Sequence, residues 1–238
     1  MKNKNIAIVI PSYNEVKNLS ILIKDIYRFL PDSKIIIVDD SSVNENKEIK
    51  KIVKNKKNII LISRLKKSGR GSAVIDGFKQ SLKDKSVEYI FEMDSDLAHD
   101  PKEFARFVNK LSNKNYGLII GSRYLPGGKI QNIAKNRTIL SRIINVFLRY
   151  WLGIHVSDFT SGFRLYSREA VQYLTQIQIE AKGFIALSEV LYKLYKKGFS
   201  ISEVPITWNF RKYGKSNVNT SELLNSLFFV LKMKILDI

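Results

Sequence analysis

Residues 6–40 read IAIVIPSYNEVKNLSILIKDIYRFLPDSKIIIVDD. Two short apolar runs, residues 6–10 and 35–38, enclose a segment of helix length at residues 16–29. Apolar side chains in and just after that segment recur at the three- and four-residue spacing of one helix face: Leu19, Leu22, Ile23, Ile26 and Leu30. A buried strand, an amphipathic helix and a second buried strand, in this order, predict a β-α-β unit with two parallel strands.

The same alternation continues along the first half of the chain. The strands are expected at residues 59–62, 89–93 and 117–121, and the helices at residues 44–54, 72–82 and 101–111. This order predicts an α/β fold with a mostly parallel central sheet and helices on both faces. In such sheets ligands bind outside the carboxyl ends of the strands.

The second half of the chain departs from this alternation. Residues 129–151 form a basic and strongly apolar segment, which predicts a loop and then a helix. Strands are expected at residues 163–166 and 201–208, and helices at residues 185–197 and 221–235. No linker, low-complexity stretch or internal repeat divides the chain. We therefore predict one domain over residues 1–238, with a nucleotide-binding type of first half and an appended second half.

Composition narrows the classes of function. The 238 residues are 45% hydrophobic and carry a net charge of +18, which argues against intrinsic disorder and predicts an anionic partner. Nucleic acid, a lipid surface and a phosphorylated substrate all fit that charge. The chain has no cysteine, so disulfides, cysteine zinc sites and a cysteine nucleophile are excluded. Its two histidines, His99 and His155, are far apart in sequence and make a poor metal cluster.

Basic and acidic residues are unevenly placed. Residues 49–75 and 104–157 contain no carboxylate and nine basic residues each. Between these stretches five acids lie within twelve residues: Glu92, Asp94, Asp96, Asp100 and Glu103. Such a cluster in so basic a chain calls for a bound cation or a structural reason. A nucleic-acid-binding protein would interleave aromatic with basic residues, and residues 49–75 contain no aromatic residue, so nucleic acid is the least favoured partner.

The acidic cluster begins where the predicted strand at residues 89–93 ends, in Asp94-Ser95-Asp96. Two carboxylates separated by one residue just past a strand can point toward one position. Carboxylate oxygens suit Mg²⁺ or Mn²⁺ bridging a diphosphate. The alternative is a turn in which Asp100, followed by a proline, caps the next helix. That alternative explains Asp100 but leaves Asp94 and Asp96 repelling each other.

Two other strand ends carry polar residues. Pro11-Ser12-Tyr13-Asn14-Glu15 follows the first strand, where Tyr13 could stack on a base and the helix N-terminus could bind phosphate. Val38-Asp39-Asp40-Ser41-Ser42 ends the second strand, and a carboxylate there can bind a ribose hydroxyl or a base N–H. Ordinary helix capping, by Ser12 or Asn14 in the first case, is the alternative at both places.

The basic loop at residues 66–72 could cradle a phosphate, although a solvated loop explains it better when it is taken alone. Together with the strand ends it carries a family resemblance. The chain resembles the family 2 glycosyltransferases with the GT-A fold, and most closely the dolichol-phosphate (polyprenol-phosphate) mannose synthases. The matching residues span nearly the whole chain: Pro11-Ser12-Tyr13-Asn14-Glu15, Val38-Asp39-Asp40-Ser41-Ser42, Gly69-Arg70-Gly71-Ser72-Ala73, residues 93–101, Gly121-Ser122-Arg123-Tyr124, residues 158–164, Val204-Pro205-Ile206 and Gly214-Lys215-Ser216.

The resemblance implies a role for particular positions. Nucleotide contacts fall on Pro11, Tyr13, Glu15, Val38 and Asp40, and metal and diphosphate contacts on Asp94, Ser95 and Asp96. Phosphate-handling residues fall on Arg123, Arg137, Ser141 and Arg211. Three positions depart from the family pattern. Ala98 stands where a third side-chain ligand often follows the aspartates, residues 44–46 replace a common Asp-Gly-Thr, and the family's lysine near residue 217 has moved to Lys215.

For the reaction, the resemblance implies metal-dependent, inverting transfer of mannose from GDP-mannose to the phosphate of a polyprenyl (dolichyl) phosphate. Residues 1–122 would bind the nucleotide sugar and residues 123–238 the acceptor. The expected catalytic residues are Asp94, Asp96, Arg123 and Arg137. The alternative is transfer from a UDP-linked sugar, either to a polyprenyl phosphate or to a hydroxyl of a cell-surface polysaccharide. A hydroxyl acceptor would need a base, for which Asp158 or Glu189 are the candidates.

A lipid-linked acceptor requires access to a membrane surface. The predicted helices at residues 137–151 and 226–235 combine an apolar side with basic residues, which is typical of helices in a membrane interface. Packing onto the core explains either helix as well. The apolar runs are too short to span a bilayer and no secretion signal is visible, so we expect a cytoplasmic, peripherally membrane-associated protein. A separate membrane-anchoring subunit would serve the same purpose.

Overall fold

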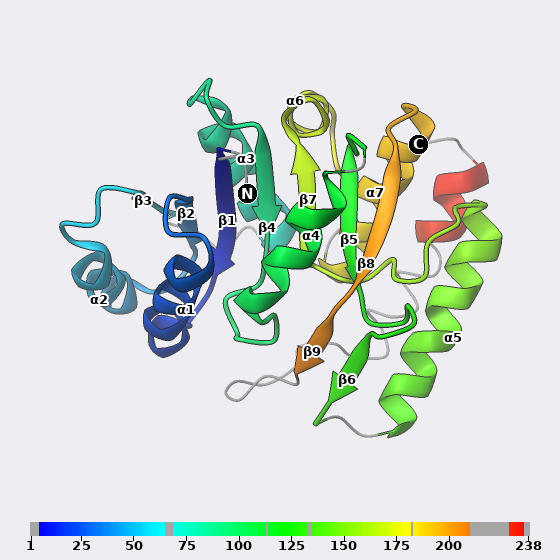
Figure 1. Cartoon of the computed structure of the whole chain (residues 1–238), viewed down its shortest axis with the longest axis horizontal. Helices are drawn as coiled ribbons and strands as arrows, with labels where there is room; N and C mark the ends of the chain where they lie inside the picture. Colours follow the sequence, from blue (N-terminus) through cyan, green and yellow to red (C-terminus); the bar gives the residue numbers. More distant parts are fainter. Residues whose placement is uncertain are drawn as a thin grey trace.

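The computed structural model describes residues 5–64, 69–112, 114–132, 135–181, 183–209 and 229–235. Seven strands form a central sheet in the order β3-β2-β1-β4-β7-β5-β8, from left to right in Figure 1. They are β1 (Ile6–Ser12), β2 (Lys34–Asp39), β3 (Ile59–Ser63), β4 (Tyr89–Glu92), β5 (Leu118–Ser122), β7 (Arg164–Ser167) and β8 (Ile201–Pro205). Within this sheet β7 runs antiparallel to β4 and β5, and the other neighbours are parallel. The sheet is therefore mostly parallel, as the sequence predicts.

Helices cover both faces of the sheet, and the side chains of β1 alternate between them. Ile8 and Ile10 belong to one buried cluster, to which α1 (Val16–Phe29), α2 (Val43–Val53) and α4 (Phe104–Lys110) contribute. Ala7 and Val9 belong to a second cluster, to which α3 (Arg70–Leu82), α5 (Lys135–Leu152), α6 (Arg168–Gln176) and α7 (Ala186–Lys196) contribute. Burial on both faces explains why these strands are nearly continuous apolar runs in the sequence.

Helix α3 lies close against β1. A Cβ atom at Gly77 would come within 2.3 Å of Val9 Cγ1, so the helix can approach this near only with a glycine at that position. The helix begins at Arg70, directly after Gly69, which has a φ of 91°. This packing places Arg70 beside the carboxyl end of β4.

The predicted strand at residues 201–208 is two strands. The first, β8, ends at Pro205, which has no N–H to donate to the ladder. The second, β9 (Thr207–Asn209), leaves the main sheet and pairs in parallel with β6 (Lys129–Gln131). In Figure 1 this two-stranded sheet lies at the bottom, below the carboxyl ends of the parallel strands.

Helix α6 is absent from the sequence prediction, although its start signal is present. Ser167 is the N-cap and accepts a hydrogen bond from Ala170 N at 3.2 Å. Val171 and Leu174 follow at helical spacing and are buried. The helix has nine residues and follows β7 without a connecting turn, so its short apolar pattern merges with that of the strand.

The predicted final helix at residues 221–235 is helical over residues 229–235, and its other residues lie outside the described part of the chain. Val230 and Met233 are buried, and Trp151 Nε1 of α5 donates to Val230 O at 3.2 Å. The described turns therefore pack onto the core. In the described residues, no helix combines the length and the hydropathy needed to cross a membrane.

Candidate active site

A pocket of about 360 Å³ lies at the carboxyl edge of the sheet, where β1, β2 and β4 end. Seven predicted site residues line it: Pro11, Tyr13, Glu15, Asp40, Asp94, Ser95 and Asp96. The remaining lining residues are Ser12, Gly69, Arg70, Ala73, Thr160, Gly162, Gly183 and Leu187. Val38, predicted to contact the nucleotide, is fully buried in the core and is not part of the lining. Three strand ends that are distant in sequence thus meet at one hollow.

The paired aspartates lie in a turn whose backbone is fixed locally. Asp96 Oδ1 accepts a hydrogen bond from Ala98 N at 3.1 Å. Asp94 N donates to His99 Nδ1 at 3.3 Å, and the buried His99 ring stacks on Phe163. Burial lowers the pKa of His99, which favours the neutral ring with Nδ1 as an acceptor. The histidine therefore supports the turn from behind, and the two carboxylates face the pocket.

Asp100 has the capping role of the alternative interpretation. Its Oδ1 accepts from Lys102 N at 3.0 Å at the start of a 3₁₀ helix, Pro101–Glu103, that leads into α4. Glu103 is also structural, because it accepts from Thr207 N at 3.1 Å. Capping thus explains Asp100, and the two pocket-lining aspartates need another explanation.

A partly buried network of charges lies behind Asp94. Arg70 donates from Nε to Asp94 Oδ1 at 2.8 Å and from Nη1 to Glu92 Oε1 at 2.6 Å. Tyr166 OH donates to the other Glu92 oxygen at 2.7 Å, and Glu92 is only 2% exposed. Burial alone would lower the pKa of Arg70, but the attraction of Asp94 and Glu92 outweighs it and raises that pKa. Arg70 is therefore a permanent cation against the Asp94 carboxylate.

Gly162, from the second half of the chain, closes this network. A Cβ atom at Gly162 would lie 2.5 Å from Arg70 Nη2 and 3.0 Å from Asp94 Oδ2. Arg70 Nη2 is buried and has no hydrogen-bond partner among the described residues. The backbone at residue 162 thus needs a glycine to approach the aspartate.

The two acids at the end of β2, Asp39 and Asp40, have different roles. Asp40 lines the pocket and pairs with Arg64 through two bonds, Nε to Oδ1 at 2.5 Å and Nη2 to Oδ2 at 2.6 Å. Asp39 is fully buried and accepts from Ser41 Oγ at 2.7 Å. The N-cap of α2 is Ser42, so helix capping explains neither acid. Asp39 holds the loop in place, and Asp40 presents its carboxylate to the pocket wall.

The residues after β1 also do not cap a helix in the predicted way. The N-cap position of α1 is Glu15, without a side-chain cap, so the alternative of capping by Ser12 or Asn14 is wrong. Ser12 Oγ is buried in the pocket wall and has no hydrogen-bond partner within the described part of the chain. A bound ligand would satisfy such a hydroxyl. Tyr13 keeps 44% of its surface exposed, which suits stacking on a base.

Arg123 follows β5 and forms a closed pair with Asp158. Its Nε and Nη2 donate to the two Asp158 oxygens, both at 2.7 Å, and its backbone N donates at 3.0 Å. Nη2 also donates to Thr160 Oγ1 at 2.7 Å, and Thr160 lines the pocket. Burial alone would raise the pKa of Asp158, but Arg123 outweighs it and holds that pKa below its usual value. Arg123 thus borders the pocket through Thr160.

Ser141 is brought to Arg123 by a tyrosine. Tyr124 OH donates to Ser141 Oγ at 2.7 Å. The Tyr124 ring lies 5.3 Å from the guanidinium carbon of Arg123 and 5.7 Å from that of Arg142. We call Arg123, Tyr124, Ser141 and Arg142 the basic cluster. Two of its members are predicted phosphate-handling residues, and Arg142 is an addition from the structure.

Three other predicted residues are described in part or not at all. Arg211 and Lys215 lie outside the described residues. Of Arg137 only the backbone is described, in the first turn of α5. It is four residues before Ser141, so both positions lie on one face of the helix.

Neither predicted base faces the pocket. Asp158 is fully buried in its pair with Arg123. Glu189 of α7 is also fully buried, accepts from Ala181 N at 2.7 Å and pairs with Lys193 at 2.8 Å. Both carboxylates stabilise the backbone around them. Neither is therefore positioned to act as the base that a hydroxyl acceptor would need.

The pocket fits a divalent cation that is shared with a diphosphate. In the described part of the chain, no group of three or more His, Cys, Asp or Glu side chains could hold a metal ion by itself. Asp94 and Asp96 supply two carboxylates to the same pocket. Because Mg²⁺ is held through one or two carboxylates plus substrate phosphates in such sites, two carboxylates are sufficient.

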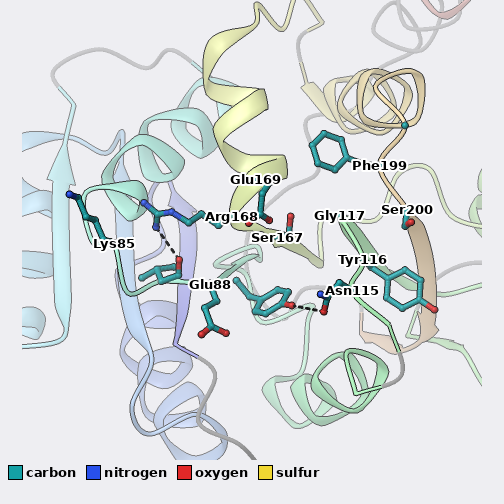
Figure 2. Close-up of a pocket in the computed structure, with 13 residues that line it drawn as sticks. Lys85, Glu88, Asn115, Tyr116, Gly117, Ser167, Arg168, Glu169, Phe199 and Ser200 are labelled. Atoms are coloured by element: carbon teal, nitrogen blue, oxygen red, sulfur yellow. Dashed lines mark hydrogen bonds between the residues drawn. The ribbon is translucent and has the colours of Figure 1, made fainter.

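A second hollow, of about 510 Å³, lies at the opposite edge of the sheet (Figure 2). It is lined by residues at the amino ends of β4, β5 and β8, among them Glu88, Tyr116 and Ser200. Arg168, labelled in Figure 2, is used structurally, because it donates to the carbonyl oxygens of Leu82, Asp84 and Val87. Among the described residues, none of the predicted site residues lines this hollow, so we favour the smaller pocket as the candidate ligand site.

Sequence reasoning missed the roles of Arg70, Glu92 and Gly162. One signal was available. Glu92 lies in a strand that is otherwise apolar, and a carboxylate buried in a strand needs a cationic partner. That partner is Arg70, and its position depends on how α3 packs against the sheet. A local sequence pattern does not predict this packing.

The fold, a mostly parallel sheet with helices on both faces, is that of the GT-A class. The profile of glycosyl transferase family 2 matches residues 7–175, and the chain belongs to that family. The protein is therefore a glycosyltransferase.

Two curated relatives extend the match over most of the chain. It is 31% identical to the polyprenol monophosphomannose synthase of Mycolicibacterium smegmatis over 225 residues, which cover 94% of this chain and 84% of the relative. It is 29% identical to the undecaprenyl-phosphate mannosyltransferase of Micrococcus luteus over 212 residues, covering 89% and 86%.

Among solved structures, the glucosyl-3-phosphoglycerate synthase of Mycobacterium tuberculosis shares the fold. Its complex with phosphoglyceric acid superposes with a TM-score of 0.68 at 18% identity, covering 98% of this chain and 80% of that one. Its complex with Mn²⁺, UDP-glucose and phosphoglyceric acid gives a TM-score of 0.67 at 19% identity, with the same coverage.

Proposed function

We propose that this glycosyltransferase transfers mannose from GDP-mannose to the phosphate of a polyprenyl (dolichyl) phosphate. The observation that carries the proposal is the position of the basic cluster, which borders the aspartate-lined pocket through Thr160. An anionic acceptor is expected beside such a cluster. The two curated relatives, whose names specify a polyprenol or undecaprenyl phosphate and mannose, support the same substrate class.

In this proposal the first half of the chain binds the donor. Tyr13 stacks on the base, and Asp40, held in position by Arg64, accepts hydrogen bonds from the nucleoside. Asp94 and Asp96 would hold Mg²⁺ or Mn²⁺, which when bound would supply positive charge against the leaving diphosphate.

The acceptor phosphate attacks without a protein base. A phosphate monoester has a second pKa of about 6, so its oxygen is largely ionised near neutral pH. That oxygen forms a bond to the anomeric carbon while the bond from this carbon to the donor's β-phosphate oxygen breaks. The nucleoside diphosphate leaves with the electron pair, and the configuration inverts. The burial of Asp158 and Glu189 supports an acceptor that needs no base.

The second half of the chain binds the acceptor in this proposal. Arg142 and Ser141, with Arg137, Arg211 and Lys215 from the resemblance, position the phosphate against repulsion from the donor. Arg123, whose charge is balanced by Asp158, holds Thr160 and Tyr124 in place.

Helix α5 carries two apolar faces, and the outer one supports membrane contact. Leu148 and Leu152 pack into the core, whereas four aliphatic residues and one tyrosine are exposed: Ile139, Leu140, Ile143, Val146 and Tyr150. Arg142 lies among them and lines a hollow of about 450 Å³ with Ile139, Ile143 and Val146. Apolar side chains next to basic ones are typical of helices that lie in a membrane interface. We propose a peripheral membrane position on this face.

Acceptor competition tests the proposal. Purified protein is incubated with Mg²⁺ or Mn²⁺, labelled GDP-mannose or UDP-glucose, and either polyprenyl phosphate or a free saccharide. We expect label in the chloroform-extractable product with GDP-mannose and polyprenyl phosphate. Label in the lipid with UDP-glucose instead would change the donor, and label in the saccharide alone would overturn the lipid-phosphate acceptor.

A further inference from the structure

We propose that Arg70, anchored by Glu92, acts as a fixed internal cation against Asp94, and so makes metal binding depend on the nucleotide. The proposal rests on the metal site of the proposed function. It adds a positioning role for two residues that the sequence did not assign to the site.

The guanidinium and a metal ion compete for the same carboxylate. Arg70 Nε donates to Asp94 Oδ1 at 2.8 Å, so a divalent cation at Asp94 must bind beside a fixed positive charge. The other oxygen, Asp94 Oδ2, lies on the side of Gly162. Asp96 Oδ1 already accepts from Ala98 N at 3.1 Å. Without a nucleotide, the protein therefore offers a metal ion few oxygen ligands, and the positive charge of Arg70 repels the ion.

Glu92 keeps Arg70 in this position. Its two oxygens are bound by Arg70 and Tyr166, and it is 2% exposed. A buried carboxylate without a cation is strongly unfavourable, so Arg70 cannot leave Glu92 when a metal approaches Asp94. Together Arg70, Glu92, Asp94 and Asp96 carry a net charge of minus two. Without Arg70 the three carboxylates carry a charge of minus three.

A nucleoside diphosphate changes this balance. Its phosphate oxygens complete the metal coordination that the aspartates leave unfinished, and its negative charge offsets the repulsion from Arg70. Metal and nucleotide then bind far better together than apart. Removing Arg70 should weaken this dependence, because the aspartates alone become a better metal site.

Direct metal binding tests the role of Arg70. Free Mn²⁺ is measured by electron paramagnetic resonance during titration of the protein alone, with GDP, and with UDP. The variants are Arg70→Met and the double variant Arg70→Met/Glu92→Gln, which avoids an unpaired buried carboxylate and keeps an acceptor for Tyr166. The matched control is Arg106→Met, which removes an arginine paired with the buried Glu103 outside the pocket lining.

We expect the wild-type protein to bind Mn²⁺ weakly alone and more tightly with one of the nucleotides. In both Arg70 variants the affinity for Mn²⁺ alone should rise about tenfold, which is the size of one pKa unit for a neighbouring charge. The increase in Mn²⁺ affinity on adding the nucleotide should be smaller in these variants than in the wild type. The control should behave as the wild type. A folded double variant with wild-type affinity for Mn²⁺ alone, or an equal rise in the control, would overturn the role of Arg70.

The test separates this inference from the proposed function. Nucleotide-dependent Mn²⁺ binding that is unchanged in the Arg70 variants removes the internal cation and leaves the metal site intact. If no protein binds Mn²⁺ with either nucleotide, the metal site is wrong and the inference is overturned with it. A failure to glycosylate polyprenyl phosphate changes the acceptor and leaves the Mn²⁺ result standing.

Discussion

Two of the arginine–aspartate pairs at the carboxyl edge of the sheet differ in how far their carboxylates are exposed. In the pair of Arg123 and Asp158, both carboxylate oxygens are bound by the arginine and the aspartate is fully buried. In the pair of Arg70 and Asp94, the aspartate side chain keeps 33% exposure and lines the pocket. The same two groups thus form a buried structural ion pair in one place and leave a carboxylate accessible to a ligand in the other. The difference is whether the pocket reaches the carboxylate.

Breaking the closed pair should have the largest effect. Asp158→Asn leaves the buried Arg123 guanidinium without its counter-charge, which typically costs about 3–5 kcal/mol of unfolding free energy. Urea unfolding followed by circular dichroism measures this loss. A loss below about 1 kcal/mol, the range of an exposed pair, would show that the pair is not closed.

The closed pair should also depend on pH. Because Arg123 holds the pKa of Asp158 below its usual 3.8, the pair contributes fully above pH 3.8 and its contribution is lost as the pH falls below that value. The difference in unfolding free energy between wild type and Asp158→Asn should therefore shrink below pH 3.8. A difference that stays constant down to the lowest pH at which the protein folds would contradict this assignment.

Beside the open pair, loss of the second pocket carboxylate, Asp96, should affect turnover and spare the fold. Asp96→Ala should reduce kcat at least about 100-fold, the scale of losing stabilisation of a developing charge. Removal of divalent metal with a chelator should abolish the activity of the wild type. The midpoint of urea unfolding should change little, since Asp96 lies in the pocket wall. Retained turnover in Asp96→Ala would refute the metal assignment.

Crowding the open pair should have an intermediate effect. In Gly162→Ala the new methyl group would meet Arg70 Nη2 at 2.5 Å and Asp94 Oδ2 at 3.0 Å. Overpacking of this kind costs about 1–3 kcal/mol, and we expect the affinity for Mn²⁺ with nucleotide to fall about tenfold. Gly71→Ala is the matched control, because its methyl group would meet Ala186 Cβ at an ordinary 3.6 Å. Equal effects of both substitutions would argue against a specific contact at Asp94.

The smallest effect is expected outside the two pairs, on the outer face of α5. Ile143→Asn should weaken binding to anionic lipid vesicles about fivefold, since a partly inserted aliphatic side chain contributes about 1 kcal/mol. Sedimentation with vesicles measures this binding. Ile21→Asn on α1 is the matched control, because Ile21 is 47% exposed on a different helix. Equal losses for both variants would remove α5 as the membrane contact.

Much of the fold and part of the site are predictable because they depend on local patterns. The apolar runs of β1, β2 and β4 and the helical spacing in α1 are visible in the sequence. Polar residues at strand ends locate Tyr13, Asp40 and Asp94, because parallel strands bring their carboxyl ends to one edge.

The partners of the carboxylates depend on contacts between distant segments, so the sequence does not predict them. Arg70 and Asp94 are 24 positions apart, and Arg123 and Asp158 are 35 positions apart. The direction of β7 is equally hidden, because the pattern of a four-residue strand reads the same whether it runs parallel or antiparallel to its neighbours. Without that direction, Gly162 cannot be placed beside Asp94, nor Tyr166 beside Glu92.

The central position of β7 has a consequence for how the molecule can form. β4 and β5 do not pair with each other; each pairs with β7, which comes from the second half of the chain. During synthesis, a chain that has emerged from the ribosome only as far as β5 therefore lacks the strand that lies between β4 and β5 in the sheet. Tyr166, which secures Glu92, is missing as well. Because long-range pairing is the slow part of folding, the donor pocket should mature only after residues 164–167 emerge, and a fragment of residues 1–122 should not bind nucleotide.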